Sequence, residues 1–156
     1  MMTEQRHSPD YGPLSMLIVE DEALIAADME YMIEREGHLA SAMVNSVGEL
    51  LKVPQSSHFD LALVDVQLAA NSSGLDACAI IRRRWPDCMV VFVTANPKMI
   101  PAEGVGEHGV IMKPFSEATM RSAIRYAAQT IHHPPPFPPV PDSFFSATGF
   151  RQMFNA

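Results

Sequence analysis

The stretch LALVDVQL, residues 61–68, places four apolar residues directly before an aspartate. A short run that is apolar at every position is typical of a strand buried on both faces, as in a parallel sheet. Similar apolar runs occur at residues 16–19, 39–44, 89–93 and 110–112. The sequence therefore predicts five strands, each buried on both faces.

Segments with helical periodicity separate most of these runs. We predict four helices, over residues 22–36, 46–52, 75–84 and 116–132. Gly37 provides a C-terminal cap for the first helix, and Ser116 caps the start of the last one. Segment 98–108 contains two glycines and a proline, so any helix there should be short or irregular.

Strands that alternate with helices indicate an α/β domain, because right-handed crossovers leave few other topologies. We predict a flavodoxin-like, doubly wound fold. Its five-stranded parallel sheet has the order 2-1-3-4-5, with helices on both faces. In such a fold the ligand site lies beyond the carboxyl ends of the strands, near the switch in strand order.

The chain has 156 residues, which suits one domain with a substantial hydrophobic core. Residues 1–13 are predicted to be a flexible lead-in, and residues 14–132 the folded domain. Segment 133–156 begins with six prolines within residues 134–141, which indicates a stiff polyproline II spacer. An aromatic tail follows, with Phe144, Phe145, Phe150 and Phe154.

Composition excludes several classes of function. A net charge of -7 argues against nucleic acid as a partner, since such domains carry a basic face. The two cysteines, Cys78 and Cys88, do not form a disulfide framework or a zinc motif. No segment has the roughly 20 apolar residues that span a bilayer, and no secretion signal is evident. We therefore expect a cytoplasmic protein without membrane insertion.

Polar side chains follow the predicted strands at the edge where a ligand would bind. They are Glu20, Asp21 and Glu22 after the first strand, Asp65 after the third, Thr94 after the fourth, and Lys113 with Pro114 after the fifth. Three acids gathered at one edge repel each other unless a cation compensates them. Mg²⁺ prefers such oxygen ligands, so the pattern predicts a magnesium site.

A carboxylate near Mg²⁺ can attack phosphorus and form an acyl phosphate. Thr94 offers a hydroxyl to a phosphoryl oxygen, and Lys113 offers a positive charge. Each residue alone also has an ordinary explanation. Acids favour the start of a helix, a threonine suits a strand, and a lysine suits the surface. The combination is far more specific than any member.

The motifs LIVEDE, LALVDVQL, VFVTA and MKPF, in this order, resemble the response regulator receiver family over residues 14–132. The resemblance implies that Asp65 is the phosphoacceptor. Asp21, Asp65 and the backbone carbonyl of Gln67 would bind Mg²⁺, and Glu20 would hold a metal-bound water. Thr94 would be the switch hydroxyl and Lys113 the phosphate-binding lysine. The peptide bond between Lys113 and Pro114 would be cis.

Two departures from the family pattern are informative. Val110 stands where receivers often carry a tyrosine or phenylalanine that reports phosphorylation, so output through that aromatic residue is not expected. The loop DVQLAANSSG, residues 65–74, replaces the frequent DxxMP loop and has an extra residue before Gly74. Both VFVTANP and the irregular fourth connection resemble receivers of the alphaproteobacterial general stress response. Those receivers are joined to a sigma-factor-like domain, which this sequence does not contain.

The leading hypothesis is a single-domain response regulator in two-component signalling. It would take a phosphoryl group from a histidine kinase or histidine phosphotransfer protein and signal by protein contact or by phosphorelay. It would not be an enzyme beyond its own phosphorylation and dephosphorylation, and would be a monomer or weak homodimer. One alternative is a binding module or kinase modulator whose aromatic tail packs on the domain, a second subunit or a kinase; a disordered tail is equally open. An aspartate-nucleophile phosphohydrolase is less favoured, because its nucleophile would follow the first strand.

Overall fold

The computed structural model describes residues 12–69 and 71–132, together with the backbone of residues 144–146. The expected lead-in, the proline-rich spacer and most of the aromatic tail lie outside the described residues. The elements in chain order are β1 (Ser15–Val19), α1 (Ala23–Arg35), β2 (Leu39–Val44), α2 (Val47–Lys52), β3 (Leu61–Val64), α3 (Gly74–Arg84), β4 (Met89–Thr94), the 3-10 helix η1 (Pro97–Met99), β5 (Gly109–Met112), α4 (Glu117–His132) and β6 (Phe144–Ser146).

One sheet runs through the whole domain in the order β2-β1-β3-β4-β5-β6. Neighbours among the first five strands pair in parallel, which confirms the predicted order 2-1-3-4-5. The sixth strand, β6, pairs antiparallel with β5 and was not predicted. Its three residues are too few to show a strand pattern in the sequence.

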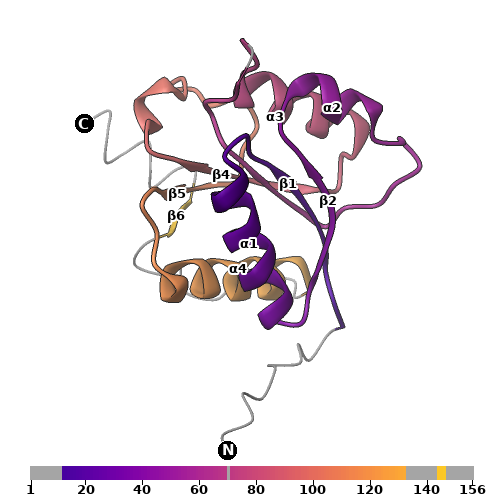
Figure 1. Cartoon of the computed structure of the whole chain (residues 1–156), viewed down its shortest axis with the longest axis vertical. Helices are drawn as coiled ribbons and strands as arrows, with labels where there is room; N and C mark the ends of the chain where they lie inside the picture. Colours follow the sequence, from indigo (N-terminus) through magenta and orange to yellow (C-terminus); the bar gives the residue numbers. More distant parts are fainter. Residues whose placement is uncertain (1–11, 70, 133–143, 147–156) are drawn as a thin grey trace, which may run out of the picture.

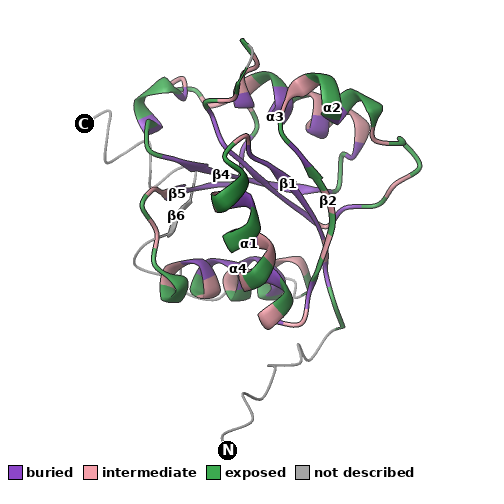
Figure 2. Cartoon of the chain, in the orientation of Figure 1, coloured by how far each residue is buried: buried purple, intermediate pink, exposed green. Residues whose placement is uncertain are grey.

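Helices cover both faces of the sheet, as predicted. Figure 1 shows α1 and α4 on one face, and α2 and α3 on the other. Met29 of α1 and Ile124 of α4 belong to the first core cluster, whereas Leu50 of α2 and Ile81 of α3 belong to the second. The strands are mostly buried and the outer surfaces of the helices are exposed (Figure 2). The result is a three-layer domain with a core on each side of one sheet.

The helix ends follow the predicted capping. The Ser116 hydroxyl oxygen accepts a hydrogen bond from the Thr119 N–H at 3.1 Å, and Gly37 adopts a positive φ of 82° after α1. Between β4 and β5 the only regular element is the three-residue helix η1, within a segment that is fully described. The prediction of a short, irregular fourth connection is therefore confirmed.

One prediction about burial was wrong. Leu39 and Met43 of β2 expose 54% and 39% of their surface, so this strand is not buried on both faces. The physical reason is its position, since β2 is the outermost strand next to β1. The central strands β3 and β4 are buried at every residue, as predicted.

Candidate functional site: the carboxyl ends of the strands

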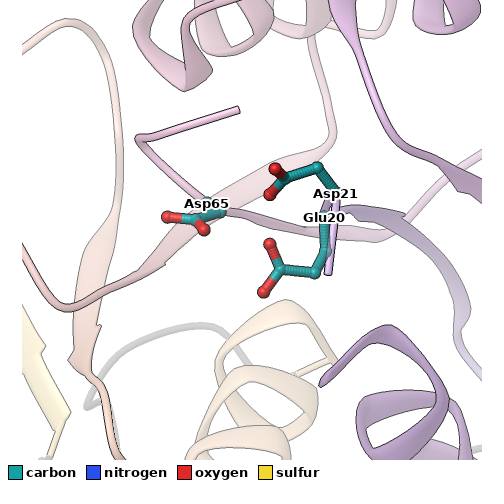
Figure 3. Close-up of side chains that lie close together, drawn as sticks. All are labelled: Glu20, Asp21 and Asp65. Carbon is teal, nitrogen blue, oxygen red and sulfur yellow. The ribbon is translucent and has the colours of Figure 1, made fainter. Parts of the chain in front are cut away.

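Three carboxylates meet where β1 and β3 end. Val19 pairs with Val64 in the parallel register, so the residues that follow lie side by side. The Asp65 N–H donates to the Val19 carbonyl at 2.9 Å, which extends this pairing by one residue. Figure 3 shows the side chains of Glu20, Asp21 and Asp65 close together. One carboxylate oxygen from each lies within 4.8 Å of the others.

Lys113 connects two of these acids from the carboxyl end of β5, at the same edge of the sheet. It follows β5, and the bond to Pro114 is cis, as expected. Its ammonium group donates to Glu20 Oε1 at 2.5 Å and to Asp65 Oδ2 at 3.0 Å. Only 10% of the lysine side chain is exposed, so this is a largely buried, shared ion pair.

Burial sets the protonation of the site. Glu20 is 3% exposed, and burial raises its pKa from the ordinary 4.5 to about 7, with Asp65 adding to the rise and Lys113 opposing it. Burial also disfavours the charged form of Lys113, but hydrogen bonds to Glu20 and Asp65 outweigh it and raise the pKa of the lysine. The site therefore contains more negative charge than one lysine compensates.

Three further residues connect the loops around the acids, namely Thr94, Asn96 and Gln67. Thr94 is buried at the end of β4, where its hydroxyl oxygen accepts from the Asn96 N–H at 3.0 Å. Its carbonyl accepts from the Lys113 N–H at 2.9 Å, which joins the ends of β4 and β5. The Asn96 side-chain amide donates to Gln67 Oε1 at 2.7 Å, and the Gln67 N–H donates to Asp65 Oδ1 at 3.2 Å. All six residues predicted for the site thus lie at one edge of the sheet.

Gly74 is a residue of the site that sequence reasoning missed. A Cβ atom at this position would lie 1.8 Å from the Asp65 carbonyl oxygen, a separation that real atoms cannot adopt. The Gly74 N–H also donates to the Val66 carbonyl at 2.8 Å, so the loop after Asp65 closes on itself. The only sequence signal was a glycine at the end of this loop, and a glycine there also suits an ordinary turn.

The donor set fits a hard divalent cation. Among the described residues, Glu20 Oε2 is buried without a hydrogen-bond partner, and three carboxylates converge next to it. An orphaned buried oxygen is costly, and a metal ion or its bound water satisfies it. Carboxylate oxygens are among the ligands that Mg²⁺ prefers.

The fold and this edge define a class of protein. The family model described as response regulator receiver domain matches residues 16–125, and the chain belongs to that family. It is therefore a receiver of two-component signalling.

Several proteins that are similar to this chain are named PhyR. The phyllosphere-induced regulator PhyR of Methylorubrum extorquens is 36% identical over 72% of this chain and 42% of its own length. The receiver domain of Erythrobacter litoralis PhyR, a solved structure, is 30% identical with a TM-score of 0.70, over 81% of this chain and 98% of that chain. A solved structure of a PhyR stress response regulator is 35% identical with a TM-score of 0.62, and the match covers 78% of this chain and 46% of that chain. The predicted similarity to general stress response receivers is confirmed.

The match concerns the receiver and not the whole length of these proteins. The chain spans about half the length of the curated relatives it matches first. None of the helices in the described part of the chain is long and apolar enough to cross a bilayer.

Proposed function

We propose that this chain accepts a phosphoryl group on Asp65 from the phosphohistidine of a histidine kinase or histidine phosphotransfer protein. One observation carries the proposal. Asp65 has its carboxylate between two further acids and a buried lysine, with the oxygens of the three acids within 4.8 Å. This arrangement provides a nucleophile, metal ligands and a positive charge for the incoming group.

The roles of the residues follow from their atoms. An Asp65 oxygen forms the new bond to phosphorus, while the bond from phosphorus to the donor's imidazole nitrogen breaks and its electron pair stays on that nitrogen. Asp21, Asp65 and the Gln67 carbonyl would hold Mg²⁺, with Glu20 binding one of its waters. When bound, Mg²⁺ neutralises phosphoryl charge. Lys113 balances further charge from the side that it already occupies.

Phosphorylation changes which partners the buried groups have. The Lys113 ammonium, now shared by Glu20 and Asp65, gains the phosphoryl oxygens as stronger acceptors. The Thr94 hydroxyl, which now accepts from the Asn96 N–H, can donate to a phosphoryl oxygen. Both residues sit at the ends of β4 and β5, so the segment 95–108 and the surface beside α4 would respond. Val110 is buried within the second core cluster, so we do not expect it to act as a surface reporter.

The similar proteins support the general part of this proposal, which is that the chain acts as a receiver. PhyR from Bartonella quintana is described as an anti-anti-sigma factor. Because this chain spans about half of such relatives, we carry over only the part that a receiver plays, which is to respond to a phosphodonor and to pass the signal on by contact.

The test is phosphorylation with Mg²⁺ and acetyl phosphate, followed by intact mass and by a phosphate-retarding gel. We expect one added phosphoryl group on the wild type, none on D65N, and none when Mg²⁺ is chelated. D60N is the matched control, since Asp60 is the same residue type at the other end of β3 and should remain irrelevant to labelling. Labelling of D65N at the wild-type rate, or labelling without a divalent cation, would contradict the proposal.

A second candidate is a binding module in which the tail carries the output. The observation in its favour is β6, which places part of the aromatic tail in the sheet of the domain. The test compares the D65N variant with a variant that lacks the tail from residue 134 onward. If D65N binds a partner protein as strongly as the wild type does, while removal of the tail abolishes that binding, the binding module replaces the phosphoryl acceptor as the proposed function.

A further inference from the structure

The outer edge of β5 is covered by a segment of the chain far away in sequence. Segment β6 pairs antiparallel with β5 in the register Gly109↔Ser146, Val110↔Phe145 and Ile111↔Phe144. It also lies beside α4. Without β6 the strand GVIM of β5 would form an open edge of the sheet, opposite the edge at β2, with unpaired backbone groups.

The register predicts which backbone groups hold β6. The Lys113 N–H donates to the Thr94 carbonyl at 2.9 Å, as the parallel register Thr94↔Met112 requires. Alternate residues of a strand direct their backbone groups to the same side, so the backbone groups of Gly109 and Ile111 face β4, whereas those of Val110 face β6. We therefore expect Val110↔Phe145 to be the hydrogen-bonded pair between β5 and β6, and no hydrogen bonds at Gly109↔Ser146 or Ile111↔Phe144.

The pairing of β6 with β5 is short. At three residues β6 is shorter than each of the five parallel strands. A strand this short adds few backbone bonds, each of which contributes on the order of 1 kcal/mol net. Short edge segments are among the parts of a fold that open locally at low free energy. The sequence before β6, with six prolines in residues 134–141, is poor in the backbone donors that would anchor it further.

We infer that the outer edge of β5 is a strand-docking site whose resident occupant is the chain's own segment 144–146. The occupied edge is closed to other strands, and release of the segment opens it to an extended peptide that pairs antiparallel through its backbone. Strand addition to a sheet edge is a general mode of peptide recognition. In this mode the affinity comes from main-chain hydrogen bonds.

The position of this edge gives it a consequence that rests on the proposed function. β5 ends at Met112, and the next residue is Lys113, whose ammonium contacts Asp65. A change of charge at Asp65 therefore acts on the strand that carries the docking edge. Strand docking itself does not require phosphorylation, so it can be tested without a phosphodonor.

The experiment uses the full chain and a proline substitution within β6. F145P removes the backbone N–H that pairs with Val110, whereas F150P makes the same chemical change outside the strand. Amide exchange by NMR should show the Val110 amide exchanging about tenfold faster in F145P than in the wild type or F150P, since the bonds that protect it are lost. The Ile111 amide, which faces β4, is the internal control and should keep its protection.

A labelled peptide of residues 142–150, DSFFSATGF, then probes the edge. It should bind F145P and restore protection at Val110, and it should bind the wild type at least about tenfold more weakly because the edge is occupied. It should lose binding when the peptide itself carries the F145P change. Equal Val110 exchange in all three proteins, or failure of the peptide to bind F145P, would overturn the inference. If wild-type Val110 is protected only in a concentration-dependent dimer, the occupant is the segment of a second copy, and the assignment within one chain is wrong. Normal phosphorylation in either case leaves the proposed function intact.

Discussion

Two aspartates stand at opposite ends of β3, and their surroundings differ. Asp60, before the strand, accepts from the Ser15 N–H at 2.8 Å and pairs with His58 at 2.9 Å. Asp65, after the strand, faces two other acids and shares one lysine with Glu20. The same residue type therefore closes a local network at one end of the sheet and belongs to an overcharged cluster at the other.

Other polar groups at the two ends differ in the same way, apart from the buried Trp85 Nε1 near the amino end of β4, which has no hydrogen-bond partner among the described residues. At the amino end, the His38 ring accepts from the Leu14 N–H at 2.9 Å, and the Arg84 guanidinium donates to the Val53 carbonyl at 2.8 Å. At the carboxyl end, a buried oxygen of Glu20 lacks a partner within the described residues. Satisfied polar groups stabilise a fold, whereas a cluster that needs a cation or phosphoryl group to be satisfied is typical of a functional site.

The largest expected effect is at Gly74, which lets the loop close on Asp65. G74A places a Cβ atom 1.8 Å from the Asp65 carbonyl oxygen, so the loop must move or the domain must unfold. We expect a loss on the order of 4 kcal/mol in the free energy of unfolding, measured with urea, together with slower phosphorylation. G48A is the matched control, because the nearest atom to its Cβ would be the Ser46 Oγ at an ordinary 3.7 Å. Similar stabilities for the two variants would show that the close approach is not real.

The next effect is a dependence of stability on pH. Folding raises the pKa of Glu20 from 4.5 to about 7, so the folded state holds this proton more tightly than the unfolded state does. The stabilisation is fully present below pH 4.5 and is lost as the pH rises through about 7, with a magnitude on the order of 3 kcal/mol. E20Q removes this contribution, so in metal-free buffer the wild type should lose more stability than E20Q between pH 5 and pH 8. Added Mg²⁺ should reduce the difference, since it favours the ionised acid. Parallel curves for the two proteins would contradict the assignment.

The smallest effect separates the two aspartates directly. D60N weakens a charge-assisted hydrogen bond to the Ser15 N–H, so we expect a loss of about 1 kcal/mol in the free energy of unfolding. Its phosphorylation rate should match that of the wild type. D65N should show the opposite result, with labelling abolished. If D60N impairs labelling as strongly as D65N does, the division between the two ends of the sheet is wrong.

The sequence by itself determined where the five parallel strands lie in the chain and which residue types follow them. Both follow from patterns that are local in the chain, whereas the order 2-1-3-4-5 was chosen among the few topologies that right-handed crossovers leave. Runs such as residues 61–64 must be buried, and a polar residue directly after such a run must lie at the edge of the sheet. Asp65, Thr94 and Lys113 could be placed at one edge for that reason alone.

Only the tertiary structure decided how these groups act on one another. The shared lysine, the buried state of Glu20 and the approach of Gly74 to Asp65 depend on loops that no local pattern describes. The pairing of β6 with β5 joins residues more than thirty positions apart, and three residues carry no periodic signal of their own. Local hydrophobic patterns specify which segments are buried, whereas contacts between distant segments decide pKa, close packing and the closure of the sheet edge.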